Sequence, residues 1–349
     1  MNYVGIDFHK AYSFITEMDE SGVICRQAKL ANEAVTLKGY LNSLPSPTKI
    51  AIEATCNWYY FYELIENHDL EVVLAHPLKT KAIASARLMN DKVSSETLAH
   101  LLRANLLPTA YIPNQKTRDI REVLRLRAFL TTLRTRLKNR VHAILLKNGI
   151  PCPYSDIFGK RSLLWLNALA LRPCYQNAIG ICTRLTSYLN EELELLNGTI
   201  ETLAYDHPYA RILETHPGIA HYSGLLIATE IGDITRFPNA GKLCSYAGLV
   251  PTMHASGGKI RMGSITKQGS RWLRWILVEA ASHAVNKSSH YEKLYHRVAF
   301  KHGKASARVA VARSICRAIY AMLKFNRPYQ ERQLRSAPWG HNHQKGSRV

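Results

Sequence analysis

The sequence predicts an α/β domain at the N-terminus, a long helical region in the middle and a mostly α-helical domain at the C-terminus. Short apolar strands alternate with helical patterns up to about residue 113. Two long stretches with apolar residues at helical spacing follow, and after residue 206 short helical segments are broken by glycine. Alternating strands and helices are typical of α/β domains, and long amphipathic stretches are typical of packed helix pairs.

The first region contains strand runs that end on acidic residues. A β-prone run ends on Asp7, and a further apolar stretch and a turn follow it, so this segment predicts a hairpin. A second strand ends on Glu53. The predicted elements are strands at 3–7, 49–53 and 70–75, a helix at 58–66 and a linker marked by Pro108 and Pro113.

The middle region contains two long helical patterns. Apolar residues recur at helical spacing over 115–148, opposite an arginine-rich face, and Gly149 to Pro151 end this pattern. A second pattern covers 179–203. Together they predict a coiled-coil-like hairpin that could mediate dimerisation, although an ordinary helix pair within one domain fits the same periodicity.

Positive charge is concentrated in three segments. The chain carries 46 Lys and Arg against 26 Asp and Glu, a net charge of +20. Ten basic residues stand against two acids in 115–148, eleven against one in 301–349, and five against none in 251–275. One charge run is commonly a solvated helix face, but three favour contacts with phosphate groups. We therefore expect nucleic acid as the partner, ahead of an anionic membrane surface.

The sequence also predicts a cytoplasmic protein, associated with the nucleoid when bound to DNA, with no membrane partner. No run approaches the roughly 18 uninterrupted apolar residues of a membrane span, and the N-terminus lacks a signal-peptide pattern. The seven cysteines form no Cys-x-x-Cys pair and no zinc-binding spacing, so we interpret them as buried thiols.

Three acidic residues are candidates for metal binding. Asp7 and Glu53 would lie side by side if their strands were neighbours in one sheet. Carboxylate oxygens suit Mg²⁺, and two such ions about 4 Å apart can polarise a phosphodiester and activate its nucleophile. Asp91 could join them from the start of a helix, although each residue taken alone is more commonly explained otherwise, Asp91 as an N-cap and Glu53 as a surface acid at a strand end.

Several short motifs follow one another in a specific order. The N-terminal half carries Gly5-Ile6-Asp7-Phe8-His9-Lys10, Ala51-Ile52-Glu53-Ala54 and Asn90-Asp91-Lys92-Val93. The C-terminal half carries His216-Pro217-Gly218-Ile219, Glu230-Ile231-Gly232-Asp233 and Ser256-Gly257-Gly258-Lys259. Because these motifs occur in this order over about residues 3–325, the chain resembles the DEDD transposases of insertion sequences. These are bridge-RNA-guided recombinases.

The resemblance implies an RNase H-like (RuvC-type) N-terminal domain and a C-terminal serine transposase domain. We therefore expect an acidic catalytic domain at 1–113, a basic coiled-coil-like region at 114–205, a transposase domain at 206–330 and a basic tail at 331–349. Asp7, Glu53 and Asp91 match three positions of the family's acidic tetrad, which implies two Mg²⁺ ions. Ser256 matches the serine that attacks the DNA backbone.

The fourth tetrad position departs from the family pattern. The family places an aspartate three residues after Asp91, one helical turn away on the same face, and here that residue is Ser94. A neutral hydroxyl is a poor Mg²⁺ ligand beside a carboxylate. Glu96 points away on an ideal helix, so we expect a weakened metal site, a water in place of the ligand, or impaired activity.

Basic residues and one turn are candidates for nucleic-acid contact. Flexible glycines after Ser256 would allow a phosphodiester to approach, although Ser-Gly-Gly is also typical of a surface turn. The segment 216–219 resembles a helix-hairpin-helix turn with exposed backbone N–H groups, and an ordinary helical turn fits it too. The candidates are Lys259, Arg261, Lys267 and Arg271, then Arg125, Arg134 and Lys138, and finally Pro217 and Gly218.

Three functions are consistent with these features. The first is a DNA transposase that excises and inserts its own element, guided by a structured non-coding RNA. The resemblance also implies a homo-oligomer, dimer or tetramer, whose composite active site joins the acidic domain of one protomer to the serine domain of another. The second is a catalytically impaired RNA- and DNA-binding copy, for which Ser94 is the argument. The third is a site-specific DNA invertase of the same family that works without a guide.

Overall fold

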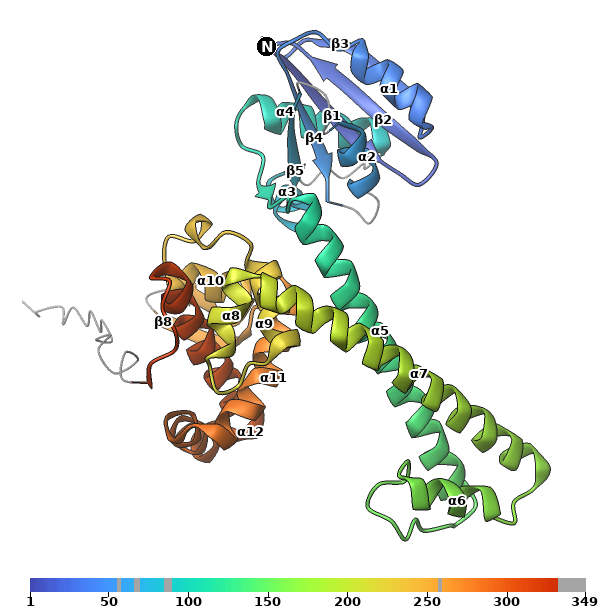
Figure 1. Ribbon diagram of the computed structural model, residues 1–349. Coiled ribbons are helices and arrows are strands. Elements are labelled where there is room, and N and C mark those ends of the chain that lie inside the picture. Colours follow the sequence, from blue (N-terminus) through green and yellow to red (C-terminus); the bar gives the residue numbers. More distant parts are fainter. Residues whose placement is uncertain (55–57, 66–69, 85–89, 257–258, 332–349) are drawn as a thin grey trace, which may run out of the picture. The chain divides into compact units, whose positions relative to one another are not determined.

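The computed structural model describes residues 1–54, 58–65, 70–84, 90–256 and 259–331 (Figure 1). These residues form two compact units, Met1–Pro113 and Asn114–Val349. In this part of the chain, no helix combines the length and the apolar character needed to cross a membrane.

The first unit is built on a mixed sheet. Strand β1 (Asn2–Phe8) lies at its centre, antiparallel to β2 (Tyr12–Met18) and parallel to β4 (Thr48–Glu53). The sheet order is β3-β2-β1-β4-β5-β6. The remaining strands are β3 (Ile24–Ala31), β5 (Glu71–Ala75) and β6 (Thr109–Ala110). The predicted hairpin and both predicted strands are present; β4 ends on Glu53 as expected, and β1 extends one residue beyond Asp7. Strand β3 was not predicted because its side chains are largely polar and exposed.

Helices cover both faces of this sheet. Alternate residues of β1 point to opposite faces, so Val4, Ile6 and Phe8 pack with α1 (Ala34–Asn42) and α2 (Trp58–Ile65). On the other face, Ala51 and Ala75 pack with Leu98, Leu101 and Leu102 of α4 (Asp91–Arg103). Helix α3 (Pro77–Ile83) follows β5. This mixed α/β unit is compatible with the predicted RNase H-like domain.

Gly5 allows α4 to lie directly against β1. A Cβ atom at this position would stand 2.0 Å from the backbone oxygen of Ser95 and 2.6 Å from the backbone nitrogen of Ala99. Only glycine therefore permits this separation of helix and strand. The side chains of Thr16 and Ser95 also form a hydrogen bond of 2.8 Å where α4 crosses β2.

The second unit begins with an antiparallel helical hairpin. Helix α5 (Gln115–Lys147) lies along α7 (Pro173–Asp206), and the short α6 (Lys160–Ala168) lies at the far end of the pair (Figure 1). Hydrogen bonds from Arg127 to Asn197 (2.7 Å) and from Arg134 to Asn190 (2.9 Å) set the register. Both helices match their predicted positions, and α7 extends further at each end.

The rest of the second unit is mostly helical, with one β-hairpin that was not predicted. Strands β7 (Pro251–Ser256) and β8 (Lys259–Ile265) pair antiparallel where glycine-broken helical segments were expected. Helix α12 bends at Gly303, whose φ of 80° lies in the left-handed region. The helices are α8 (Pro208–Glu214), α9 (His221–Ile231), η1 (Ile234–Arg236), α10 (Ala240–Tyr246), α11 (Arg271–Lys287) and α12 (Ser289–Lys324).

The cysteines differ in their exposure. Cys182, Cys244 and Cys316 are buried, as expected, but Cys25 and Cys174 are exposed, so the interpretation as buried thiols is wrong for these two. Cys25 lies on the exposed strand β3, and Cys174 lies in the first turn of α7. Cys56 lies outside the described residues.

We predict that Gly5→Ala loosens the contact between α4 and β1, at a cost of about 1–3 kcal/mol, because the added Cβ overlaps the helix backbone. Hydrogen exchange of α4 and β1 peptides, measured by mass spectrometry, reports this loss. Gly39→Ala in α1 is the matched control: its Cβ meets no atom within 4 Å, and helix propensity should favour it by about 0.5–1 kcal/mol. Equal protection in both variants would contradict the role of Gly5.

Candidate functional site

Two carboxylates lie in the last two residues of neighbouring parallel strands, Asp7 in β1 and Glu53 in β4. Ile6 of β1 stands opposite Ile52 of β4, so Asp7 and Glu53 follow at the same edge and on the α4 face of the sheet. Burial raises the pKa of both carboxyl groups, and the charge of Asp7 raises the pKa of Glu53 further. Two ionised carboxylates at this edge therefore repel each other and lack full solvation, which favours binding of a cation.

Helix α4 brings Asp91 to the same place. Asn90 is the N-cap, because its side-chain oxygen accepts a hydrogen bond of 2.9 Å from the backbone N–H of Val93. The N-cap alternative for Asp91 is therefore wrong, and its carboxylate is available for other contacts. The Tyr12 hydroxyl donates a hydrogen bond of 2.8 Å to Oδ2 of Asp91, and this bond holds the pKa of Asp91 below its usual value.

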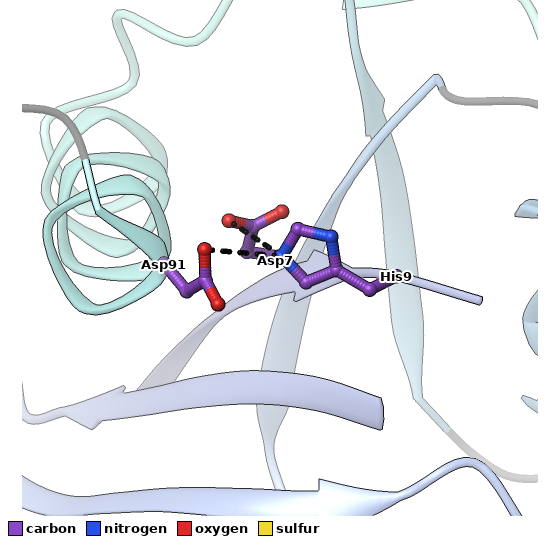
Figure 2. Close-up of side chains that lie close together, drawn as sticks. All are labelled: Asp7, His9 and Asp91. Carbon is purple, nitrogen blue, oxygen red and sulfur yellow. Dashed lines mark ion pairs between the residues drawn. The ribbon is translucent and has the colours of Figure 1, made fainter. Parts of the chain in front are cut away.

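One ring nitrogen of His9 points toward both aspartates (Figure 2). Its Nε2 atom is 3.5 Å from Oδ2 of Asp7 and 3.2 Å from Oδ1 of Asp91. One donor atom from each of these three residues lies within 4.8 Å of the others. We had not predicted His9 as a site residue, although its position two residues after Asp7, on the same side of an extended chain, was a usable signal.

Ser94 and the remaining acids occupy different places around this cluster. Hydrogen bonds from His9 and Ser94 act to lower the pKa of Asp7, against the larger effect of burial. Glu53 is half-buried beside Asp7 but is not one of the three clustered residues. Glu96 faces His100, with 3.8 Å between its Oε1 and the histidine Nε2, in agreement with the expectation that it does not replace Ser94.

The donors of this cluster fit a divalent metal ion. Two carboxylates and an imidazole are common protein ligands for such ions, and burial has already removed part of the solvation of Asp7. Asp7, Asp91 and His9 would hold the ion, with Glu53 beside it.

Three basic residues predicted to bind nucleic acid make contacts within the second unit, and their role in nucleic-acid binding stays a prediction. Arg125 pairs with the buried carboxylate of Glu230 at 3.4 Å, and Arg134 donates to Asn190. Lys138 lies over the ring of Phe158, 4.7 Å from its centre. These contacts fasten α5 to its neighbours. Exposed basic side chains of the same helix include Arg136, Arg140 and Lys147.

The turn between α8 and α9 does not present the expected free N–H groups. Gly218 is buried against α11, where a Cβ would stand 2.5 Å from the Ala280 oxygen. Its N–H donates to Nδ1 of His216 at 3.2 Å, and the N–H of Ile219 donates to the His216 oxygen. Pro217 has no N–H. The N–H groups of Gly218 and Ile219 are therefore engaged within the turn, and the helix-hairpin-helix interpretation stays a prediction.

The β7–β8 hairpin carries the remaining candidates. The backbones of Ser256 and Lys259 pair at its end, whereas their side chains, and Gly257 and Gly258 entirely, lie outside the described residues. Arg261, Lys267 and Arg271 are exposed. Their roles in nucleic-acid binding stay a prediction.

A basic cavity lies along the bent helix α12 and its neighbours. Its volume is about 1010 Å³, and no Asp or Glu is among the described residues that line it. Its lining includes His290, Lys293, Arg297, His302, Arg313 and Arg317. The charge pattern of 301–349 indicated basic character here, but the folding of α12 on itself, which brings Lys293 and Arg297 together with Arg313, was not visible in the sequence.

Two family models match this chain. The model of the IS116/IS110/IS902 transposase family matches residues 210–296. The model of DEDD transposases of IS110 matches residues 4–149, which include Asp7, Glu53 and Asp91.

Curated relatives agree with these models. The chain is 25% identical to the transposase of IS1328 from Yersinia enterocolitica, over 80% of this chain and 82% of the relative. It is 22% identical to the transposase of IS1111A from Coxiella burnetii, over 94% and 91%. It is also 33% identical to the pilin gene-inverting protein of Moraxella bovis, over 35% of this chain and 39% of that protein.

We predict that Asp7→Asn raises the free energy of unfolding at neutral pH in the presence of EDTA. Because the folded-state pKa of Asp7 is raised, its stabilising contribution is complete below the ordinary carboxyl pKa and is lost as the pH rises through the folded-state value. Asparagine avoids that loss. Urea titrations should therefore give Asp7→Asn a higher free energy of unfolding than the wild type at neutral pH, and this difference should vanish in acid.

Asp19→Asn is the control of opposite sign for this measurement. Hydrogen bonds from Ser21 and Val23 lower the pKa of Asp19, so the ionised form stabilises the fold at neutral pH. The control should lose stability at neutral pH. Destabilisation of both variants would contradict the electrostatic interpretation of Asp7.

Proposed function

Because this chain belongs to the IS110 family of DEDD transposases, we propose that it excises and inserts an insertion sequence by metal-assisted attack of Ser256 on DNA, guided by an element-encoded RNA. The observation that carries the proposal is the convergence of Asp7, Asp91 and Glu53 at one edge of the first unit. Carboxylates that are partly desolvated and adjacent are suited to a cation that contacts a phosphodiester.

The acidic residues would bind Mg²⁺, which prefers oxygen ligands and, when bound, polarises the scissile phosphate. Asp7 and Asp91 supply the two carboxylates of the cluster, and Tyr12 keeps Asp91 ionised and oriented. Glu53 stands on the neighbouring strand, where a second ion could bind between it and Asp7. Ser94 contributes a hydrogen bond to Asp7 in place of a fourth carboxylate.

Ser256 is the proposed nucleophile. It ends β7 next to two glycines, and the exposed Arg261, Lys267 and Arg271 could neutralise charge that develops on the phosphate. The serine oxygen would form a bond to phosphorus while the DNA hydroxyl leaves with a proton, so the strand is held covalently until it is rejoined. The acidic site of one protomer would serve the serine of another.

Exposed basic side chains support binding of DNA and a guide RNA. The outer face of α5 carries Arg136 and Arg140, and the cavity along α12 carries Arg297 and Arg313 without acids among its described lining residues. Contacts of this kind recognise phosphates and nucleic-acid shape rather than base sequence. A guide RNA would supply the sequence specificity that such a surface lacks.

The helical hairpin supports self-association into a dimer or tetramer. Apolar side chains on both α5 and α7 are exposed and recur at helical spacing, so each helix carries an apolar stripe. Proteins rarely leave such exposed apolar stripes uncovered. The stripes comprise Leu126, Phe129 and Leu133 of α5 and Ile181, Leu185, Tyr188 and Leu195 of α7.

A second candidate function is site-specific DNA inversion without a guide. It is favoured by the identity of 33% to the pilin gene-inverting protein, which exceeds the identities to the IS1328 and IS1111A transposases but covers only 35% of this chain. Sequencing of nucleic acid that copurifies with the protein separates the two: a defined RNA encoded beside the gene supports guided transposition, and its absence supports inversion.

We predict that Ser256→Ala abolishes covalent capture of DNA but leaves DNA affinity within about twofold, because only the nucleophile is removed. The protein, its copurified RNA and matching DNA are incubated with Mg²⁺, and protein–DNA adducts are resolved on a denaturing gel. Ser264→Ala, an exposed serine on β8, is the matched control and should still form adducts. Adducts formed by Ser256→Ala would remove this residue from the mechanism.

We also predict that Ser94→Asp tightens Mg²⁺ binding by on the order of tenfold, because it adds a fourth carboxylate next to Asp7. Calorimetry of Mg²⁺ binding and the Mg²⁺ dependence of adduct formation report the change. His100→Asp adds the same charge at an exposed position of α4 and controls for net charge. Identical Mg²⁺ curves for wild type and Ser94→Asp would mean that the site is complete without a fourth carboxylate.

A further inference from the structure

We propose that His9 is a direct metal ligand that takes the place of the missing fourth carboxylate, so that the ion between Asp7 and Asp91 has a nitrogen donor. The inference rests on the proposed metal-dependent function. It starts from the cluster itself: the three side chains that converge are Asp7, His9 and Asp91.

The distances match those between ligands that share one ion. Metal–ligand bonds of about 2.1 Å separate adjacent ligands by about 3.0 Å in octahedral and about 3.4 Å in tetrahedral geometry. Nε2 of His9 is 3.2 Å from Oδ1 of Asp91 and 3.5 Å from Oδ2 of Asp7. The imidazole nitrogen is therefore placed as a third ligand, and Figure 2 shows it directed toward both carboxylates.

The backbone and ring of His9 are held in this position. Its N–H donates to the oxygen of Tyr12 (3.0 Å), and its oxygen accepts from the side-chain amide of Asn32 (2.7 Å). Its ring packs on that of Tyr12, with 4.9 Å between the ring centres. A ligand fixed from its own backbone loses little conformational entropy when an ion binds.

Tyr12 connects the histidine to the second carboxylate. Its hydroxyl donates to Oδ2 of Asp91, which leaves Oδ1 of the same group directed at His9. The ammonium group of Lys29 lies over the Tyr12 ring, 3.8 Å from its centre. Metal-binding carboxylates are generally oriented by such a second hydrogen bond.

A nitrogen ligand changes which ion is preferred. Mg²⁺ favours oxygen donors, whereas imidazole suits transition metals, so one histidine beside two carboxylates should favour Mn²⁺ over Mg²⁺ at this position. Ser94 departs from the family's tetrad at the same site, and its hydroxyl contacts Asp7 rather than supplying a charged ligand.

The test uses the full-length protein loaded with Mn²⁺ and examined by pulsed electron paramagnetic resonance. A directly bound imidazole produces a ¹⁴N coupling to Mn²⁺, and incorporation of ¹⁵N-histidine should replace it with a ¹⁵N coupling. His9→Ala should lose the coupling and bind Mn²⁺ at least about tenfold more weakly. His100→Ala, which alters an exposed histidine on α4, should retain both coupling and affinity.

A second variant separates ligation from folding. His9→Asp should retain Mn²⁺ binding without the nitrogen coupling, and calorimetry should show its Mn²⁺-to-Mg²⁺ affinity ratio reduced by about tenfold. Mn²⁺ bound by the wild type without any histidine coupling would overturn the role of His9 and leave the metal-dependent function intact. No binding of Mn²⁺ or Mg²⁺ by either the wild type or Ser94→Asp would overturn both.

Discussion

The contact between Gly5 and helix α4 is the constraint on which the acidic site depends. Side chains normally separate a strand from the helix packed on it. Here the α4 backbone occupies the space that a Cβ atom of residue 5 would need. Asp7 follows on the same face of β1, and Asp91 and Ser94 lie in the first turn of α4. Carboxylates from segments more than 80 residues apart therefore reach one another because one residue has no side chain.

Electrostatic cost explains the residues that surround the carboxylates. Burial raises the pKa of Asp7 and Glu53, and the charges of Asp91 on Asp7 and of Asp7 on Glu53 add to this, so their ionised forms are unfavourable in the folded protein without a counter-charge. His9 and Tyr12 oppose this cost by contacts to the two aspartates. A bound cation would supply the rest. The site is thus organised around a positive charge, and His9 is placed where it can share in binding it.

The second unit divides its basic residues between packing and exposure. Glu230 is buried and receives Arg121 at 3.6 Å, Arg125 at 3.4 Å and the Ser270 hydroxyl at 2.8 Å, which joins α5, α9 and the start of α11. A buried carboxylate needs such partners, so these arginines stabilise the packing of the second unit. The surplus positive charge is left on the outer face of α5, on the hairpin of Ser256 and along α12.

The sequence by itself determined the strands ending on Asp7 and Glu53, the long helices and the three basic segments, because each follows from local periodicity and composition. The order of the motifs also singled out Asp7, Glu53 and Asp91 as candidates, and all three lie within residues 4–149 that the family model matches. Only the tertiary structure decided which side chains meet. Asn90 rather than Asp91 caps α4, His9 joins the aspartates, and Arg125 and Gly218 are used internally. These outcomes depend on contacts between distant segments, which no local pattern encodes.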